Sequence, residues 1–286
     1  MKFAFIRYQL QEYHVSTCCR VLQVSRSGYY AWLGRPVSRR QRRRAELAEQ
    51  IRAVHQDNRG VYGSPRVYRA LKAQGRRVCQ NTVAKIMREE DLRAKGKRTF
   101  VPRTTDSSHD RPVAPNVLDR EFATSVPDCK WVADITYIPT EEGWLYLAGV
   151  MDLFSRKIIG WSMTDHLRAE LVGAALEMGL ARRQPAAGLL HHSDRGVQYA
   201  CDDYQGLLRR HGIQVSMSGK GDCYDNAVME SFWSTLKTEL VHHEHYRTRE
   251  QARQSIFEYI ETFYNRKRLH SSLGYVSPEA FEAAPK

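Results

Sequence analysis

The chain has 286 residues, a net charge of +12, and 42% hydrophobic and 10% aromatic residues. This composition supports at least one packed core and excludes a mostly disordered chain. No apolar run approaches the roughly 18–20 residues that a membrane span needs. The sequence therefore predicts a cytoplasmic protein of two or three domains. It also predicts free thiols, because no C-x-x-C pair occurs among Cys18, Cys19, Cys79, Cys129, Cys201 and Cys223.

The positive charge is confined to the first third of the chain. Residues 1–105 hold 24 Lys and Arg against 7 Asp and Glu, a net charge of +17, whereas residues 106–286 carry −5. Most of the basic residues are arginines, whose planar fork matches phosphate geometry better than the ammonium of lysine. This region is therefore predicted to bind a polyanion, with nucleic acid favoured over a membrane surface.

Residues 1–38 predict a small helical domain. The stretch STCCRVLQVSRSGYYAWL at 16–33 gives an apolar helix, a break near Val24, and a second short helix. This is the spacing of a helix-turn-helix, which would carry its DNA contacts at the front of the second helix. A three-helix bundle that binds nothing is the alternative, and the charge favours DNA. The candidate contacts are Arg26, Ser27 and Tyr29.

Residues 39–95 predict a second basic helical module. The stretch RRQRRRAELAEQIRAVHQ at 39–56 repeats apolar residues at helical spacing behind an arginine-rich start. A second helix-turn-helix candidate follows, in which Ser64 caps one helix, Gly75 ends it, and another helix begins near residue 80. The candidate DNA contacts of this module are Arg42, Arg43, Arg44, Arg76, Arg77, Lys85 and Arg88.

The pattern changes twice after residue 95. Residues 96–126 mix Pro, Ser, Thr and basic residues without periodicity, which predicts a solvated linker. From 127 onward the runs CKWVADITYI, WLYLAGVMDL and SRKIIGWSMT predict three strands, and two helix–strand pairs and a long helix from Asn226 follow. Three antiparallel strands followed by α-β-α-β is the order of an α/β ribonuclease H-like domain. We expect this core over 127–286, with a C-terminal helical tail, behind N-terminal all-α helix-turn-helix modules.

Three acidic residues need an explanation in this core. Asp134 interrupts the apolar strand WVADITYI, Asp194 directly follows LLHHS at the end of a predicted buried strand, and Glu230 lies one turn into the long helix. An unpaired charge on a buried strand is costly, and open α/β sheets place ligands at strand ends. Asp134 alone could pair with a basic residue, and Asp194 alone could form a turn. The coincidence of all three favours a site for two Mg²⁺ or Mn²⁺ ions, which act together on phosphodiesters.

Four strings carry a family resemblance. WVADITYI, HHSDRGVQY, DNAVMESFWSTLKTE and YNRKRLHSSLGYVSPEAF resemble bacterial insertion-sequence transposases of the third insertion-sequence family, in the product of its second reading frame. That family belongs to the retroviral-integrase superfamily, and the resemblance covers nearly the whole chain. It implies a metal-dependent DNA transposase whose Asp–Asp–Glu catalytic triad is Asp134, Asp194 and Glu230.

The resemblance also implies a reaction and its partners. The expected enzyme binds the ends of an insertion element, cleaves a phosphodiester to free a 3′-OH, and joins that hydroxyl to other DNA. Its expected partners are double-stranded element and target DNA, at least one further copy of the chain, and a fused upstream-frame protein. It would act at the bacterial nucleoid. A nuclease of the same fold that cleaves without joining and a non-catalytic DNA-binding regulator remain alternatives, although the three acids argue against the regulator.

Further residues are assigned by helix geometry or by the resemblance. Lys237 lies almost two turns after Glu230, on the same helix face, and is expected to meet a DNA phosphate. Glu239 lies about 180° away and is predicted to face solvent. Arg268 and His270 of the tail are candidate DNA contacts by resemblance.

Three further residues are candidates for contacting and positioning the acids of the site. For Asp152 a turn or a pair with Arg156 is an equal alternative, and His192 is expected to combine packing with one supporting contact. Asn226 is expected to cap the long helix, with DNA contact as the alternative.

Overall fold

The structure, a computed structural model, describes residues 1–96, 112–219 and 223–284. The chain forms two compact units, Met1–Ala53 and Val54–Lys286. The division falls inside helix α4 (Arg39–Asp57), so it does not coincide with the boundary predicted at residue 38. The four domain limits drawn from the sequence stay predictions. No helix in the described ranges is long and apolar enough to cross a membrane.

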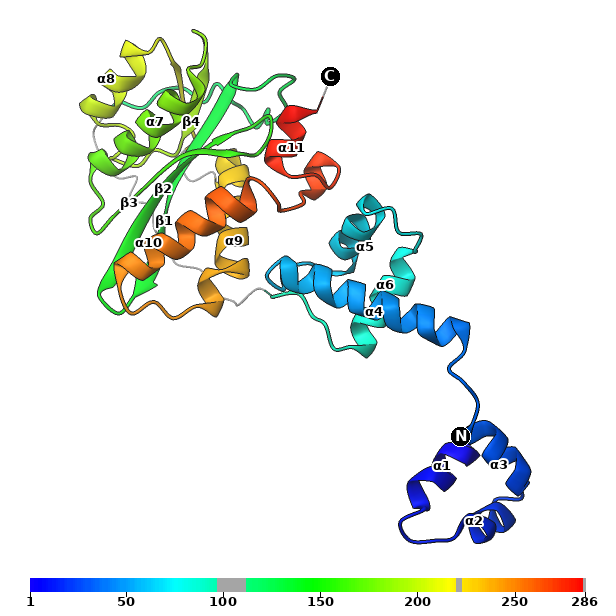
Figure 1. Cartoon of the computed structure of the whole chain (residues 1–286). Helices are drawn as coiled ribbons and strands as arrows, with labels where there is room; N and C mark the ends of the chain where they lie inside the picture. The colour runs from blue at the N-terminus through cyan, green and yellow to red at the C-terminus, as the bar shows by residue number, and fades with distance from the viewer. Residues whose placement is uncertain (97–111, 220–222, 285–286) are drawn as a thin grey trace. The chain divides into compact units, whose positions relative to one another are not determined.

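The first unit begins with three short helices (Figure 1). Ser25 caps the third helix, because its Oγ accepts a hydrogen bond from the Gly28 amide over 3.0 Å. Tyr29 belongs to the core of this bundle and is only 1% exposed, next to Ile6, Cys18 and Cys19. The prediction that Tyr29 contacts DNA is therefore wrong. The three helices are α1 (Lys2–Gln9), α2 (Val15–Val21) and α3 (Arg26–Leu33).

The second unit contains the predicted second helix pair, α5 (Ser64–Ala73) and α6 (Gln80–Glu89). Gly63, rather than Ser64, occupies the N-cap position of α5. Gly75 follows α5 with a φ of +78°, a backbone conformation that glycine adopts without steric cost. The two helices contact each other. Their apolar faces are buried, with Val67, Leu71, Val83, Ile86 and Met87 inside.

A five-stranded mixed sheet follows, in the order β3-β2-β1-β4-β5. The first three strands are antiparallel, and β4 and β5 run parallel to β1 and to each other. This confirms the predicted α/β architecture and its order of elements. The sheet elements are β1 (Lys130–Thr140), β2 (Gly143–Asp152), β3 (Ile158–Thr164), α7 (Ala169–Arg183), β4 (Leu190–Ser193), α8 (Asp202–Arg210) and β5 (Gln214–Met217).

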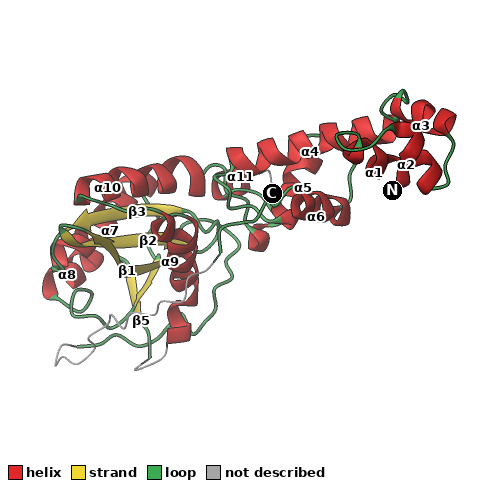
Figure 2. Cartoon of the chain, turned by 90° about the horizontal axis from the view of Figure 1, so that it is seen from below, coloured by secondary structure: helices red, strands yellow, loops and turns green. Residues whose placement is uncertain are grey.

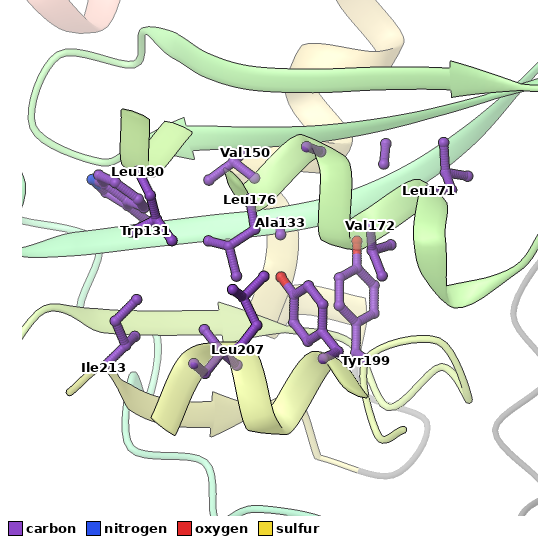
Figure 3. Close-up of a cluster of buried hydrophobic side chains, with 14 of the residues drawn as sticks. Trp131, Ala133, Val150, Leu171, Val172, Leu176, Leu180, Tyr199, Leu207 and Ile213 are labelled. Carbon is purple, nitrogen blue, oxygen red and sulfur yellow. The ribbon is translucent and has the colours of Figure 1, made fainter. Parts of the chain in front are cut away.

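Helices cover both faces of the sheet (Figures 1 and 2). One face carries α7 and α8 over a core that includes Trp131, Ala133 and Val150 (Figure 3). The contact between α7 and β3 is very close: a Cβ on Gly160 would lie 2.1 Å from the Ala175 carbonyl oxygen. The other face carries α9 (Ala227–Glu239) and α10 (Arg249–Glu258). Because strand side chains alternate, Asp134 points away from the α7 core and toward α9.

Residues 112–126 are not the solvated tether that the sequence predicts. Leu118 is 1% exposed, and the amides of Val117 and Leu118 both donate to Ser216 Oγ on β5, at 2.9 and 3.0 Å. The Met217 amide donates to the Pro115 carbonyl over 3.4 Å. This segment therefore packs on the edge strand of the sheet. The rest of the predicted linker, 97–111, lies outside the described residues.

The C-terminal tail follows α10 and packs on the core. α10 continues into a π-helical turn, η3 (Tyr259–Tyr264), whose side chains are mostly buried. The remaining elements are the 3₁₀ turns η1 (Cys223–Asn226), η2 (Val241–His243) and η4 (Ser271–Leu273), and helix α11 (Pro278–Ala283).

Candidate functional site

Two of the three acids lie on neighbouring parallel strands. Lys130, Trp131 and Val132 of β1 stand opposite Leu190, His191 and His192 of β4. Continued by two residues, this register sets Asp194 beside Asp134. Neighbouring strands are about 4.8 Å apart, so the two carboxylates emerge at the same edge of the sheet.

Asp194 is held by the turn that follows β4. The Gly196 amide donates to Asp194 Oδ1 over 2.8 Å, and Ser193 Oγ donates to the Asp194 carbonyl over 3.0 Å. A Cβ at position 196 would lie 3.0 Å from Asp194 Oδ1, so glycine permits this close approach. Asp194 therefore does form a turn, as the alternative interpretation held, while its carboxylate also remains beside β1.

Helix α9 brings the third acid to the same edge. Glu230 lies in its first turn and is exposed. α9 approaches the sheet at Gly149, which pairs with Asp134 across β1 and β2. A Cβ on Gly149 would lie 2.9 Å from Trp233 Cη2 and 3.2 Å from Met229 Cε. Only a residue without a side chain allows this contact between sheet and helix.

The pKa of Asp134 depends on both other acids. Burial raises the pKa of Asp134 well above its usual value, and the negative charges of Asp194 and Glu230 raise it further. The Ile135 amide and the Trp233 indole oppose this by hydrogen bonding to the carboxylate. The three acids thus lie within electrostatic reach of one another, and the ionised form of Asp134 lacks sufficient compensation from this chain.

Two residues that the sequence did not single out belong to this site. Trp233 Nε1–H donates to Asp134 Oδ2 over 3.0 Å. Tyr199 is buried, and the charges of Asp134 and Asp194 contribute to the rise in its pKa, after burial and the neighbouring Tyr204. Its hydroxyl has no hydrogen-bond partner among the described residues. Trp233 lies three residues after Glu230, on the same face of the helix, and that spacing was the available signal.

The residues at this edge suit a divalent cation of the magnesium type. The donors are carboxylate oxygens only, the ligand set of Mg²⁺ and Mn²⁺. Among residues 1–96, 112–219 and 223–284, no three His, Cys, Asp or Glu side chains are grouped tightly enough to hold a metal ion as they stand. Three like charges repel one another, so a tight group needs a cation between them.

Lys237 lies near the same acids. The charge of Asp134 raises the pKa of Lys237, although partial burial has the larger effect and lowers it overall. The side chain is half-buried. The predicted common face of Lys237 and Glu230 on α9 therefore brings a cation within electrostatic reach of Asp134.

Asn226 occupies the N-cap position of α9, as predicted, but its side chain contacts the strand. Its Nδ2 donates to the Ala133 carbonyl over 3.1 Å, directly before Asp134, and it makes no side-chain cap hydrogen bond to α9. The neighbouring Asp225 accepts from Asn116, Arg120 and the Gly219 amide. Asn226 therefore begins the helix and also supports the backbone of β1 beside the acid.

His192 joins two strands. Its Nδ1 lies 2.8 Å from Ser216 Oγ and its Nε2 lies 3.1 Å from Ser218 Oγ, and burial lowers its pKa to about 4. The neutral ring of His192, two residues before Asp194, therefore links β4 to the end of β5. This contact supports Asp194 only indirectly, through the strand.

Asp152 belongs to a different cluster. It is fully buried, pairs with Trp131 in the strand register, and lies 3.6 Å from Arg183 Nη2. Arg183 also binds Asp128 and Glu282. Asp152 therefore supports the far end of β1 rather than the acids at Asp134.

The tail residues predicted to bind DNA are buried. Arg268 is 5% exposed, and its Nη2 and Nε donate to the two carboxylate oxygens of Glu239 at 2.6 and 2.8 Å. His270 is also buried and packs edge-on against Tyr264. The prediction of a solvent-facing Glu239 is wrong. Arg268 and His270 belong with Glu239 to a buried polar cluster rather than to an exposed loop, and DNA contacts at these two residues stay predictions.

The helical modules keep most of their candidate DNA contacts on the surface. Tyr29 is the exception described above, and Arg44 is half-buried. The exposed candidates are Arg26, Ser27, Arg42, Arg43, Arg76, Arg77, Lys85 and Arg88.

Comparison with known proteins identifies the family. Two models of an integrase core domain match residues 125–223 and 211–278, and a model of an HTH-like domain matches residues 41–100. The transposase InsF for insertion sequence IS3A of Escherichia coli (strain K12) is 46% identical over 284 residues, which cover 99% of this chain and 98% of the relative. The chain belongs to the IS3 family of transposases.

This transposase has further relatives. A 31 kDa protein of insertion element IS600 from Shigella sonnei is 47% identical over 263 residues, covering 92% of this chain and 96% of that protein. Among solved structures, a simian T-cell lymphotropic virus intasome matches with a TM-score of 0.48 and 14% identity, over 76% of this chain and 70% of that one. The HTLV-2 integrase catalytic core in complex with magnesium matches with a TM-score of 0.42 and 13% identity, over 55% of this chain and 97% of that one.

The family membership confirms the main interpretation of the sequence. The protein is a DNA transposase, an enzyme with an integrase core domain and an HTH-like domain. Neither the nuclease nor the regulator alternative gains support from these relatives.

Proposed function

We propose that Asp134, Asp194 and Glu230 hold two divalent cations, Mg²⁺ or Mn²⁺, and catalyse phosphoryl transfer on DNA. The observation that supports this most directly is the effect of Asp194 and Glu230 on Asp134: both charges raise its pKa, so acids from β1, the end of β4 and α9 act on one point. Bound there, the cations supply Lewis-acid stabilisation of the charge that develops on the phosphodiester oxygens.

The proposed reaction has two steps at phosphorus. In the first, water attacks the phosphodiester at an element end, the bond from phosphorus to the 3′-oxygen breaks, and a 3′-OH leaves. In the second, that hydroxyl attacks a phosphodiester of the target, and a target 3′-OH leaves. Glu230 helps to orient each nucleophile, and Trp233 fixes the rotamer of Asp134. No covalent bond to the protein is needed.

Double-stranded DNA is the proposed partner of the basic region as well as of the core. The exposed arginines of α3, α4 and the turn between α5 and α6 would neutralise phosphates of the element end. Lys237, which lies near Asp134, would meet a phosphate close to the cleaved bond.

Two DNA ends must be joined, so we propose that the active form contains at least two copies of the chain. The predicted fusion to an upstream-frame protein and the association with the bacterial nucleoid remain parts of the same proposal. Light scattering of the chain with and without element-end DNA measures the copy number. Strand joining by this chain alone would remove the need for the fusion.

The decisive experiment replaces the acids one at a time. Asp134→Asn, Asp194→Asn and Glu230→Gln should each lower cleavage of an element-end duplex by more than about 100-fold, beyond the loss typical of a disturbed supporting contact. Binding of the same duplex should persist. Glu177→Gln, at an exposed acid of α7, is the matched control and should cleave normally.

A second substrate separates a transposase from a nuclease. A duplex that already ends in the 3′-OH needs no cleavage, so its joining to a plasmid isolates the second step. Wild-type joining and its loss in all three acid variants is the expected result. Strand joining that survives in those variants would remove the three acids from the catalytic centre.

A further inference from the structure

A pocket of about 360 Å³ lies beside α9, the helix that carries Glu230. Ser231 and Thr235 line it from α9, one and five residues after Glu230, and are therefore rotated by about 100° and 140° from that acid. Its wall contains three arginines from distant parts of the second unit: Arg66 of α5, Arg156 of the turn between β2 and β3, and Arg268 of the tail.

The positive charge in this pocket is only partly compensated. Glu239 binds Nη2 and Nε of Arg268, which leaves Nη1 directed at His270 Nε2, 3.4 Å away. Arg66 donates through Nε to the Leu269 carbonyl over 2.9 Å, an interaction with a neutral group. Within the described ranges, neither Arg66 nor Arg156 forms an ion pair with a carboxylate, although the charge of Asp152 reaches Arg156.

Arg156 is held in an unusual backbone conformation. Its φ is +62°, in the left-handed region that glycine and asparagine adopt more readily than arginine. Its amide donates to the Asp152 carbonyl over 2.8 Å, which closes the turn. An arginine at such a position costs stability relative to asparagine or glycine, and the side chain of this one lines the pocket.

The neighbouring histidine shows how closely the three arginines converge. Burial and the charges of Arg268, Arg66 and Arg156 lower the pKa of His270 to about 3. His270 is therefore neutral at physiological pH, and the arginines alone supply the charge of the pocket. An anion would relieve their mutual repulsion.

We propose that the pocket binds one phosphodiester group of the DNA strand that enters the catalytic centre. This proposal rests on the proposed function, because the strand position is measured from Glu230. The pocket and Glu230 share helix α9, so the bound phosphate lies within a few nucleotides of the cleaved bond. Arginine forks and hydroxyl groups are the common partners of DNA phosphates, and Ser231, Thr235, Ser271 and Ser272 supply the hydroxyls.

The test variant is Arg156→Asn, because asparagine suits the left-handed backbone and removes the charge without disturbing the turn. Its melting temperature should equal or exceed that of the wild type. In EDTA, which prevents cleavage, its affinity for an element-end duplex should fall roughly tenfold. The slope of log K against log salt should fall by about 0.9, the value for one phosphate contact on duplex DNA. Arg209→Gln, at an exposed arginine of α8 outside the pocket, should keep the wild-type slope.

Single methylphosphonate substitutions locate the contact on the DNA. Neutralising one phosphate within a few nucleotides of the cleaved bond should weaken wild-type binding, and the same substitution should have no further effect on Arg156→Asn. A wild-type salt slope in a folded Arg156→Asn variant, or equal sensitivity of both proteins at every phosphate, would overturn the proposal.

These measurements are independent of catalysis. Because binding is measured in EDTA, cleavage by Asp134→Asn or Glu230→Gln would overturn the proposed catalytic centre and leave the result for the pocket standing. Conversely, a pocket variant with an unchanged slope leaves the three acids untouched.

Discussion

The indole of Trp233 donates a hydrogen bond to the carboxylate of Asp134, with 3.0 Å between Nε1 and Oδ2. This bond joins α9 to β1 at an acid of the proposed catalytic centre. Because Trp233 is one turn from Glu230 on the same helix, it fixes the position of the helical acid relative to the strand acid. Metal affinity should therefore depend on a residue that binds no metal.

Trp233→Phe should weaken metal binding without unfolding the protein. The phenyl ring keeps most of the packing against Gly149, but the donor to Asp134 is lost. Loss of a contact that orients a metal ligand typically costs 10–100-fold in metal affinity or activity. The Mn²⁺ concentration for half-maximal cleavage should rise by about that factor. Trp144→Phe, at an exposed tryptophan of β2, is the control. Equal Mn²⁺ requirements in both variants would contradict the role of Trp233.

Gly149→Ala should push α9 away from the sheet. The added Cβ would lie 2.9 Å from Trp233 Cη2, a distance that side chains do not tolerate. Overpacking of this kind costs about 1–3 kcal/mol, and cleavage should fall with it because Trp233 must move from Asp134. Gly173→Ala on α7 meets no atom within 4 Å and should stabilise the helix by up to about 1 kcal/mol. Urea denaturation measures the free energy of unfolding of both variants. If Gly149→Ala left this free energy unchanged, α9 would be loosely packed against the sheet.

Arg268→Met should destabilise the core. It leaves Glu239 buried, with the Tyr259 hydroxyl as a remaining donor at 2.7 Å. Breaking a buried pair by removing one partner costs about 3–5 kcal/mol, whereas replacing both partners by apolar residues is often much less costly. The double variant Glu239→Leu/Arg268→Met should thus be more stable than the single one. Wild-type stability of Arg268→Met would contradict the contribution of the buried pair.

Asp152→Asn should change the pH dependence of stability. Burial raises the pKa of Asp152 from 3.8 to about 6. The protonated form therefore favours the folded state, and this contribution is present below pH 4 and is lost as the pH rises to about 6. Asparagine does not titrate, so the stability of Asp152→Asn relative to wild type should increase by about 2 kcal/mol between pH 4 and pH 7. Urea denaturation at the two pH values measures it, and a constant difference would contradict the raised pKa.

Local sequence patterns were sufficient for the elements and for the three acids. The β-rich run WVADITYI and the short stretch GLLHHS predict strands because the pattern that marks a strand is a property of a few consecutive residues. Asp134 could be singled out by the same logic, since a charge inside an apolar strand needs a partner wherever that strand packs. The register that sets Asp194 beside it comes from the pairing of β1 with β4, which only the tertiary structure shows.

The partners of polar side chains depended on the tertiary structure. Tyr29 was predicted to be on the outside of α3 and is in its core, because helix spacing gives a face but not what covers it. Glu239 was assigned to solvent on the same kind of argument, whereas the covering residue, Arg268, comes from a segment 29 residues further along the chain.

What the sequence determined by itself was the α/β order, the basic N-terminal third and the acids that need a cation, because each is visible as a local pattern or as a charge out of place. Only the tertiary structure decided that Trp233 holds Asp134, that Arg268 is buried, and that Arg66 and Arg156 share a pocket. The physical reason is that a side chain far along the chain supplies each of these partners, and its approach is set by the packing of whole elements.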